Sequence, residues 1–288
     1  MIEPTLLAKN NSHERDSHVY FEEGPHIYTV DGDDSFMSVT TWNHSHFSHF
    51  DADKIITKMM NGRNWKKSKY FGKTREEIKA QWDENGRISS EAGTKMHYDI
   101  ECYYNEIHNN NSSIEFKYFL NFDDWVKANT NMLPYRTEMI VWDKELKLCG
   151  SIDMLYENEF GELEIYDWKR CKKIEKTSGF NKWGKTECIE HLPDTNFWHY
   201  ALQLNTYKYL IEKNYGKKVK DMYLICLHPN NSNKNFMRFK VPHLNNEIND
   251  LMDLRKEMVK KEKEKPYFTV TDTSGNVLDM KLYYDENV

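Results

Sequence analysis

The sequence predicts a mixed α/β fold, in which helices pack on a central sheet of parallel and antiparallel strands. Three consecutive strands are expected at residues 136–142, 146–156 and 162–169, since tight polar turns separate these apolar stretches. A helical pattern at residues 194–214 and a strongly apolar strand at residues 221–228 follow. A helix that joins two strands can cross over the sheet and set them parallel, so the sheet is expected to be mixed.

The composition favours a folded chain with a sizeable core. The 288 residues are 39% hydrophobic and 14% aromatic. The net charge of −6 excludes a globally basic nucleic-acid-binding protein, but it leaves room for a locally basic groove. No apolar stretch approaches the roughly 20 residues that cross a bilayer, and the N-terminus lacks the apolar region of a secretion signal. We therefore expect a soluble, intracellular protein of the cytoplasm or nucleus, with no membrane partner.

The cysteine pattern gives no support for a small cross-linked or metal-stabilised domain. The five cysteines are odd in number and widely spaced, and no two form a CxxC pair. Neither a disulfide framework, a zinc ribbon nor an iron–sulfur cluster is therefore supported. We expect five reduced thiols.

The N-terminal part of the chain adds short strands and two helical segments to the predicted core. The strands are expected at residues 18–21, 26–30 and 36–42. A helix is expected at residues 51–60. A longer helical pattern at residues 74–107 is expected to break near Asn85-Gly86.

The C-terminal part is expected to add a strand, a charged helix and a hairpin. These elements are predicted at residues 236–241, 244–263, 267–270 and 277–284. The chain thus divides into an N-terminal segment (1–85), a central core (86–230) and a C-terminal extension (231–288), which we expect to pack as one compact domain.

One predicted strand combines a buried apolar face with two charged groups. Residues two apart on a strand face the same side, so Ile165, Asp167 and Lys169 share one face. Ionised groups at the end of a buried strand need a partner or a metal ion. A simple ion pair between Asp167 and Lys169 at the sheet edge would also satisfy them, and it is the favoured interpretation of this strand taken alone.

The preceding strand brings a second carboxylate close to this pair. Folding the hairpin about the turn at residues 158–161 sets Asp153 opposite Tyr166 or Asp167. Two neighbouring carboxylates repel each other unless a cation lies between them. Hard cations such as Mg²⁺ and Mn²⁺ take oxygen ligands, so the pattern predicts a site for one of these ions.

Further polar residues fall on neighbouring predicted elements, although each is ordinary when taken alone. Glu138 begins the first of the three strands and could point to the same end of the sheet. His97 lies on the long helix. Gln203 and Tyr207 are four residues apart on the later helix and therefore face one side. The alternative interpretations are that Glu138 is an exposed acid, that His97 is an ordinary histidine, and that Gln203 and Tyr207 form the polar edge of an amphipathic helix.

Together, these residues resemble the PD-(D/E)XK nuclease superfamily in its RecB-like branch. The matching motifs, in the order of that branch, are Gly93-Thr94-Lys95-Met96-His97, Glu138, Gly150-Ser151-Ile152-Asp153, Asp167-Trp168-Lys169 and Gln203-Leu204-Asn205-Thr206-Tyr207. The match spans residues 91–228. The N-terminal pattern is also similar to that of exonucleases of large DNA viruses and phages, and of the mitochondrial genome-maintenance exonuclease. The resemblance implies a restriction-endonuclease-like core with the order αβββαβ.

The resemblance implies metal-dependent hydrolysis of phosphodiester bonds, with Mg²⁺ or Mn²⁺ as the cofactor. Asp153 and Asp167 would hold the cation. His97 and the main-chain carbonyl of Trp168 would be further ligands. Glu138 would ligate a metal or position the helix residues. Such a cation polarises the scissile phosphate and lowers the pKa of a bound water.

The remaining motif residues would act on the phosphate and the substrate. Lys169 would orient the attacking water or stabilise charge that develops on the phosphate. Gln203 and Tyr207 would orient this lysine or the substrate strand. Some members of the branch bind an iron–sulfur cluster, which the cysteine pattern here does not support.

Two basic segments with interleaved aromatic residues are expected to follow the phosphates of a nucleic acid. Residues 58–73 contain six cations and no acid, and residues 169–185 directly follow the Asp–Lys strand. Cations that track a backbone, mixed with rings that stack on bases, suit a single strand. The predicted contact residues are Arg63, Trp65, Lys66, Lys67, Lys69, Tyr70, Arg170, Lys172, Lys173, Lys182 and Trp183. The alternative for each segment is a solvated basic loop whose rings pack on the core.

The sequence thus favours a DNA exonuclease that acts on single strands or free ends in replication, recombination or repair. Two alternatives remain open: an RNA-directed endonuclease of the same fold, and a catalytically inactive nucleic-acid-binding or replication-scaffold protein. The Gln–Tyr helix favours DNA, and the intact set of Asp153, Asp167 and Lys169 favours an enzyme. A monomer is favoured over an oligomer.

Overall fold

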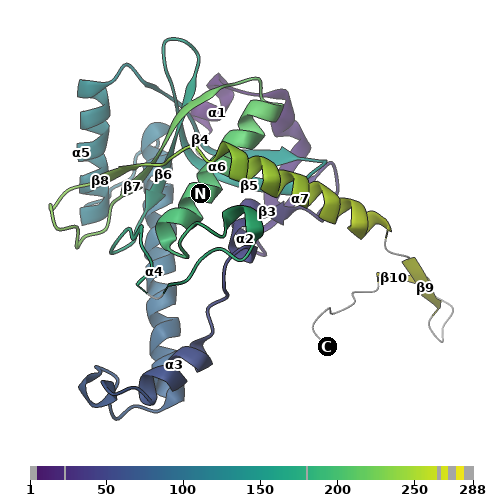
Figure 1. Cartoon of the computed structure of the whole chain (residues 1–288). Helices are drawn as coiled ribbons and strands as arrows, with labels where there is room; N and C mark the ends of the chain where they lie inside the picture. Colours follow the sequence, from purple (N-terminus) through teal and green to yellow (C-terminus); the bar gives the residue numbers. More distant parts are fainter. Residues whose placement is uncertain (1–4, 23, 180, 265–266, 272–276, 282–288) are drawn as a thin grey trace.

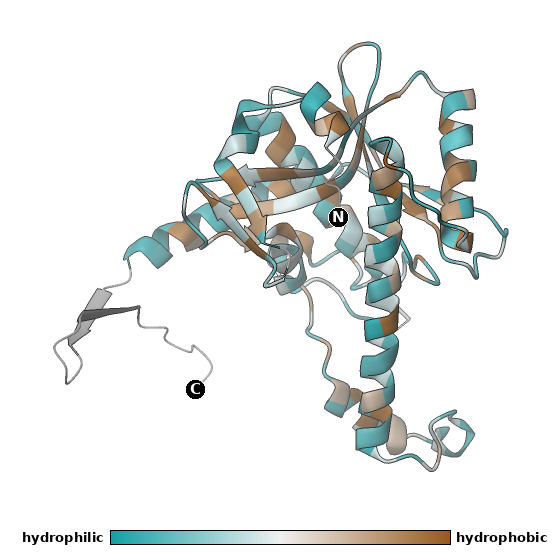
Figure 2. Ribbon diagram, turned by 180° about the vertical axis from the view of Figure 1, so that it is seen from behind, coloured by the Kyte–Doolittle hydropathy of each residue, from teal (hydrophilic) through white to brown (hydrophobic). Residues whose placement is uncertain are grey.

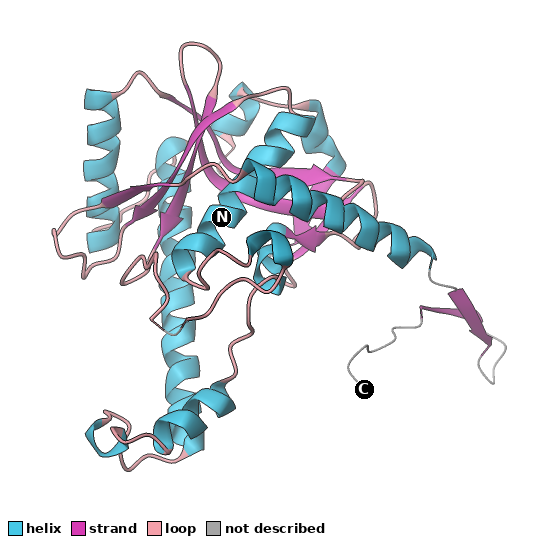
Figure 3. Ribbon diagram, viewed as in Figure 1, coloured by secondary structure: helices cyan, strands magenta, loops and turns pink. Residues whose placement is uncertain are grey.

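The computed structural model describes residues 5–22, 24–179, 181–264, 267–271 and 277–281. Within these residues, helices pack on both faces of a six-stranded mixed sheet (Figures 1 and 3). This arrangement confirms the predicted mixed α/β class. Among the helices of these residues, none combines the length and the apolar character needed to cross a membrane.

Three consecutive strands pair antiparallel in the sheet, as the sequence predicts. They are β4 (Leu133–Asp143), β5 (Leu148–Glu157) and β6 (Leu163–Lys169). Helix α6 (Asn196–Asn214) then crosses over and leads to β7 (Val219–Cys226), which pairs with β6 in parallel. The predicted succession of three strands, a crossover helix and a parallel strand is therefore confirmed.

The register between β5 and β6 is one of the two that the sequence predicts. Met154 lies opposite Tyr166, so Asp153 is level with Asp167. Side chains at facing positions of antiparallel strands have Cβ atoms about 5 Å apart. The register therefore brings these two carboxylates to the same end of the sheet.

Two short strands extend the sheet, and two hairpins lie outside it. β8 (Met237–Lys240) is antiparallel to β7, and β3 (Met37–Ser38) pairs in parallel with the start of β5. The hairpin strands are β1 (Val19–Glu22), β2 (Ile27–Val30), β9 (Tyr267–Thr271) and β10 (Val277–Lys281). Both hairpins confirm predicted strands, and the predicted residues 282–284 lie outside the described part of the chain.

Helices cover both faces of the sheet (Figure 2), and buried apolar residues form a layer on each face. The remaining helices and 3-10 turns are α1 (Leu6–Asn10), η1 (Glu14–His18), α2 (Val39–Ser45), α3 (Ala52–Met60), η2 (Trp65–Lys67), α4 (Arg75–Tyr104), α5 (Ile114–Asn129), η3 (Glu187–Ile189) and α7 (Asn245–Glu264). Helices α2, α6 and α7 pack on the face of β6 that carries Ile165. Helices α4 and α5 pack on the face that carries Tyr166 and Trp168. Side chains thus alternate along β6 as the sequence predicts.

Residues 36–42 are largely helical, so the strand predicted there is wrong. Only β3 pairs as a strand, and α2 follows at once. The Ser38 hydroxyl accepts a hydrogen bond from the Thr41 backbone N–H and thereby caps the helix. The β-branched residues of this segment favour a strand locally, but the helix buries Val39 and Trp42 in the core.

The predicted break near Asn85-Gly86 is also wrong, because α4 runs through both residues without interruption. A glycine in a helix costs only about 1 kcal/mol. Arg87 forms ion pairs with Glu84 and Glu91 across the same turns. One continuous helix therefore joins the N-terminal segment to the central core.

Helix α5 has no counterpart in the prediction. Ser113 caps its N-terminus by accepting a hydrogen bond from the Phe116 backbone N–H. Phe119, Phe122 and Val126 lie on one face and are buried. Their spacing of three and four residues is a helical signal that could have revealed α5 from the sequence.

The start of α6 also differs from the prediction. The sequence predicts the helix from residue 194, whereas Thr195 occupies the N-cap position and the helix begins at Asn196. The Asp194 carboxylate instead lies 2.9 Å from Nε2 of His199, on the first turn of the helix. Gly216 follows the C-terminus of the helix with a φ of 64°, as expected for a helix-terminating glycine.

We expect Phe119→Ala to reduce the free energy of unfolding by about 3–5 kcal/mol. Phe119 is fully buried, and its ring lies 5.4 Å from that of Tyr104 and 5.7 Å from that of Trp168. Chemical denaturation monitored by circular dichroism measures the change. The control is Phe160→Ala, at a side chain that is 78% exposed. Equal stability of the two variants would contradict the packing of α5 on the sheet.

Candidate metal centre

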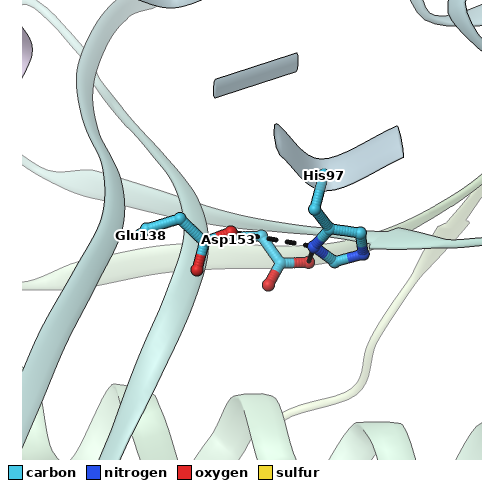
Figure 4. A group of neighbouring side chains, drawn as sticks. All are labelled: His97, Glu138 and Asp153. Atoms are coloured by element: carbon cyan, nitrogen blue, oxygen red, sulfur yellow. Dashed lines mark ion pairs between the residues drawn. The ribbon is translucent and has the colours of Figure 1, made fainter. Parts of the chain in front are cut away.

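Three potential metal ligands from three elements meet at one end of the sheet. His97 comes from α4, Glu138 from β4 and Asp153 from β5 (Figure 4). One ligand atom of each residue lies within 4.8 Å of the others. Among the described residues, no second group of three such side chains meets this distance. The structure therefore brings together three of the residues that the sequence selects.

The pairing of β4 with β5 sets two of these ligands side by side. Met139 lies opposite Ile152, so Glu138 is level with Asp153. Glu138 has a φ of 44°, and a non-glycine residue in this left-handed region is strained by roughly 1–3 kcal/mol. The Ser151 hydroxyl donates a hydrogen bond to Glu138 Oε2 at 2.7 Å. Strain of this kind within a strand is typical of functional positions.

The main chain of Trp168 orients both His97 and Asp153. The Trp168 N–H donates to Asp153 Oδ2 at 2.7 Å, and the Trp168 carbonyl oxygen lies 3.0 Å from His97 Nε2. Because a carbonyl can only accept, Nε2 carries the hydrogen. Nδ1 therefore faces the carboxylates, at 3.6 Å from Asp153 Oδ2 and 3.7 Å from Glu138 Oε1. A neutral His97 in this tautomer presents its Nδ1 lone pair to a metal. The resemblance implies the Trp168 carbonyl as a ligand, and in this structure that carbonyl accepts a hydrogen bond from His97.

Burial and like charges disfavour the ionised form of Asp153. Burial, together with the charges of Asp167 and Glu138, raises the pKa of Asp153 to about 7, although His97 opposes this shift. Burial alone lowers the pKa of His97, but the Asp153 and Glu138 carboxylates outweigh it and raise the pKa to about 9. Burial raises the pKa of Glu138, but the neighbouring His97 and Lys169 and the hydrogen bond from Ser151 outweigh it and lower this pKa. The group therefore attracts positive charge, which a bound cation would supply.

Asp167 lies beside this group but outside it. Its Oδ2 is 2.6 Å from Lys169 Nζ, and both side chains are largely buried. The Lys169 ammonium also lies 4.6 Å from the centre of the Tyr200 ring on α6. Burial lowers the pKa of Lys169, but the charges of Asp167 and Asp153 outweigh it, so the lysine is cationic. The sequence predicts Asp167 as a metal ligand or as the ion-pair partner of Lys169, and in this structure its carboxylate contacts Lys169.

The glutamine and tyrosine of α6 pack against the glycine of β5. A Cβ atom on Gly150 would lie 2.9 Å from Cε1 of Tyr207, so the close approach of the ring requires glycine. Gln203 Nε2 donates to the Tyr207 hydroxyl at 3.2 Å and lies 3.5 Å from Oγ1 of Thr40. The Gly150–Asp153 motif of β5 and the Gln203–Tyr207 motif of α6 therefore depend on each other sterically.

The first basic segment, residues 58–73, exposes its cations more than its rings. Trp65 and Tyr70 are half-buried, and the Tyr70 hydroxyl accepts a hydrogen bond from Trp82 Nε1 at 2.8 Å. Tyr70 therefore also packs within the segment. The exposed members of the predicted set are Arg63, Lys66, Lys67 and Lys69.

The second basic segment is only partly available to a nucleic acid. Arg170 is largely buried, and its Nε donates to Glu115 at 2.8 Å, which ties the loop after β6 to α5. Its predicted role in binding is therefore not supported by its position. Lys173 is exposed but lies 2.8 Å from Glu175. The exposed members of the predicted set are Lys172, Lys173, Lys182 and Trp183.

Two residues near the centre have no role in the sequence-based prediction. Ser151 lies inside the Gly–Ser–Ile–Asp motif, and a hydroxyl next to a predicted ligand is a signal that could have identified it. Tyr28 lies on β2, and burial, together with the charges of Cys149 and Glu138, raises its pKa. No local pattern points to Tyr28, because only the tertiary fold brings β2 to this site.

The donor set fits a divalent cation. Two carboxylates and one imidazole suit Mn²⁺, and the carboxylates also suit Mg²⁺, which strongly prefers oxygen. The His97 and Glu138 side chains are 29% and 32% exposed, so an ion can reach them from solvent. Asp153, whose ionisation is unfavourable here, is the ligand that gains most from a neighbouring cation.

Comparisons with known proteins do not assign this chain to a family. No family model matches the sequence, and no curated protein sequence matches it. A solved structure, "Crystal structure of SSO0001", aligns over 91% of this chain and 87% of its own, at 13% sequence identity and a TM-score of 0.30. Similarity at this level supports no argument about function.

We expect Mn²⁺ to raise the melting temperature of the wild-type protein. A ligand that binds only the folded state adds about 2.7 kcal/mol of stability at a concentration of one hundred times its Kd. Asp153→Asn should remove this shift because it removes a charged ligand. Differential scanning calorimetry with Mn²⁺, Mg²⁺ or EDTA measures the effect.

The control for the metal prediction is Glu159→Gln, which removes an exposed carboxylate from the turn between β5 and β6. This variant should keep the full shift. A full shift in Asp153→Asn, or none in the wild type, would show that the three side chains do not form a metal site.

Proposed function

We propose that this protein is a metal-dependent nuclease of the RecB-like PD-(D/E)XK type, which hydrolyses phosphodiester bonds in DNA. The supporting observation is the convergence of a candidate metal group and a buried cationic lysine at one end of the sheet. His97, Glu138 and Asp153 form the group, and Asp167 holds Lys169 beside it. Hydrolysis of a phosphodiester needs positive charge at the phosphate and an activated water, and these residues can provide for both.

Each residue of the centre has a role that follows from its contacts. When bound, a divalent cation polarises the scissile phosphate and lowers the pKa of a water molecule. His97, Glu138 and Asp153 would hold it through their clustered ligand atoms. Lys169, fixed by Asp167, would stabilise negative charge that develops on the phosphate. Because its ammonium is already positioned, little reorganisation is needed when the charge appears.

The exposed cations and rings support single-stranded DNA or DNA ends as the substrate. Stacking on a protein ring requires an unpaired base, and exposed cations contact phosphates whatever the sequence. Phe71 is 54% exposed and Trp183 is 48% exposed, so each offers a ring to solvent within a basic segment. These features favour a single strand over a closed duplex.

The proposal is tested by cleavage of labelled single-stranded DNA, double-stranded DNA and RNA of the same sequence. Each is incubated with Mn²⁺, Mg²⁺ or EDTA. Metal-dependent cleavage of DNA that is lost in Asp153→Asn supports the proposal. Cleavage of RNA alone would indicate an RNA endonuclease, and binding without cleavage would indicate an inactive nucleic-acid-binding protein. Either result contradicts the proposed function.

We expect Lys169→Ala to slow DNA cleavage by a factor on the order of 10²–10³, because it removes a charge that acts in the transition state. The affinity for DNA should change much less. Single-turnover rates and fluorescence anisotropy measure the two quantities separately. Lys218→Ala, which removes an exposed lysine paired with Glu162, is the control and should leave both unchanged. An equal loss of rate and affinity would show that Lys169 only binds phosphate and does not act in the transition state.

A further inference from the structure

The start of α4, together with α3 and η2, stands away from the core as an arm, defined here as residues 52–86 (Figures 1 and 3). The arm is held together by its own contacts. Arg75 donates to Thr57 Oγ1 at 2.8 Å, and Trp82 donates to the Tyr70 hydroxyl at 2.8 Å. The first bond joins α4 to α3, and the second joins α4 to the basic loop of the arm.

The tip of the arm contains a hollow that suits a phosphate-bearing strand. Its volume is about 610 Å³, and it is lined by Met59, Gly62, Arg63, Asn64, Trp65, Lys67 and Ser68. The surrounding residues 58–73 have six cations and no acid. The exposed Phe71 ring lies 5.9 Å from that of Trp65 at this hollow. Cations and rings together match the phosphates and bases of a single strand.

The arm tip lies far from the candidate metal centre along α4. Arg75 and Trp82, which contact α3 and the basic loop, precede His97 by 22 and 15 residues. At about 1.5 Å per residue, these separations are about 33 and 22 Å along the helix. A stacked strand advances about 3.4 Å per nucleotide, so it needs about seven to ten nucleotides to span this distance.

The part of α4 between the arm tip and the metal centre offers little electrostatic attraction to a nucleic-acid strand. Asp83, Glu84 and Glu91 lie on this stretch, and Arg87 is already paired with the two glutamates. Lys172 and Lys182 are exposed again on the loop after β6, at the core. A nucleic-acid strand would therefore be bound at two places, the arm tip and the core.

We propose that the arm tip is a second binding site for the substrate strand, so that efficient cleavage requires a strand of at least about seven to ten nucleotides. This inference rests on the proposed nuclease function. A shorter strand reaches the metal centre but not the tip. Its cleavage would then depend on the contacts at the core alone.

The test compares cleavage of single-stranded oligonucleotides from about 4 to about 30 nucleotides long, which bracket the distance. For the wild type, kcat/KM should rise in a step of on the order of tenfold once the strand reaches the tip. The charge-reversal variant K66E/K67E should lose the step and cleave short strands normally. The control K260E/K261E makes the same charge change on the exposed face of α7 and should keep the step.

The outcomes separate this inference from the proposed function. Cleavage that does not depend on length, or a step that K66E/K67E retains, overturns the second site and leaves the nuclease assignment intact. If no oligonucleotide is cleaved, the proposed function fails. Fluorescence anisotropy of the same series then still tests the arm, because affinity should show the same step in the wild type and lose it in K66E/K67E.

Two thiols lie close together near the ends of β6 and β7. Cys171 follows Lys169 by two residues, and Cys226 lies opposite Lys169 on β7. The two sulfur atoms are 4.0 Å apart. Cys171 is half-exposed whereas Cys226 is buried, so an oxidant from solvent reaches Cys171 first.

We infer that Cys171 and Cys226 form a reversible disulfide in the presence of a peroxide. The two thiols give up two electrons and two protons as the S–S bond forms, and hydrogen peroxide is reduced to two molecules of water. Bond formation brings the sulfurs from 4.0 Å to about 2.05 Å, which requires the Cys171 and Cys226 side chains to rotate toward each other or the segment after Lys169 to move toward β7. The disulfide would therefore form directly beside the lysine of the candidate active site.

The thiol inference is tested by mass spectrometry, which does not depend on nuclease activity. After treatment with hydrogen peroxide, the protein should lose two hydrogens, and digestion should yield one peptide pair linked through Cys171 and Cys226. A thiol reductant should restore the original mass. C171S should form no link, whereas C188S, at another half-exposed cysteine, should form it normally. Unlinked thiols, or oxygen addition at Cys171 alone, overturn the inference.

Discussion

The main chain of Trp168 connects the elements that form the candidate metal centre. Its N–H binds Asp153 on β5, and its carbonyl binds His97 on α4. Its side chain is buried against α5, with the ring 5.7 Å from that of Phe119 and 5.5 Å from that of Phe122. The position of β6 in the core therefore sets the position of two of the three ligands. A shift of this strand would disturb the core and the site together.

The charges at this end of the sheet do not balance within the protein. Among the described residues, the carboxylates of Glu138, Asp153 and Asp167 converge with two groups that can be cationic, His97 and Lys169. A fourth carboxylate, that of Glu101, is close enough that burial and the Glu138 charge raise its pKa to about 8. The raised pKa values of Asp153 and His97 are the consequence, since both shifts reduce the net negative charge. A metal-free protein relieves the repulsion by holding protons. A divalent cation would relieve it without them, which is why the site is suited to an ion.

The continuous helix α4 gives the molecule its shape. One end of the helix contributes His97 and packs on one face of the sheet, and the other end supports the basic arm (Figure 1). A break at Gly86 would have left the arm without a fixed direction relative to the core. Because the helix is continuous, the distance between the arm and the metal centre is a property of the fold. Because this distance is fixed, we propose that the arm binds a distant part of a long, flexible substrate.

The sequence by itself determined the order of the elements and most residues of the site. Periodicity and turns predicted β4 to β7 and α6, because these signals are local. The face shared by Ile165 and Asp167 followed from the two-residue repeat of a strand. Helix α5 was missed although its aromatic spacing was visible, and the helix at α2 was mistaken for a strand because burial of Trp42 overrides the local preference.

Only the tertiary structure decided how the site residues divide their contacts. The sequence left Asp167 either as a ligand beside Asp153 or as the partner of Lys169, and the fold pairs it with Lys169 and brings Glu138 to Asp153 and His97. The left-handed conformation of Glu138 and the tautomer of His97 have no local sequence signal. Each depends on contacts between residues far apart in the chain. Local patterns set which side chains are available, whereas the packing of strands and helices sets the distances between their atoms.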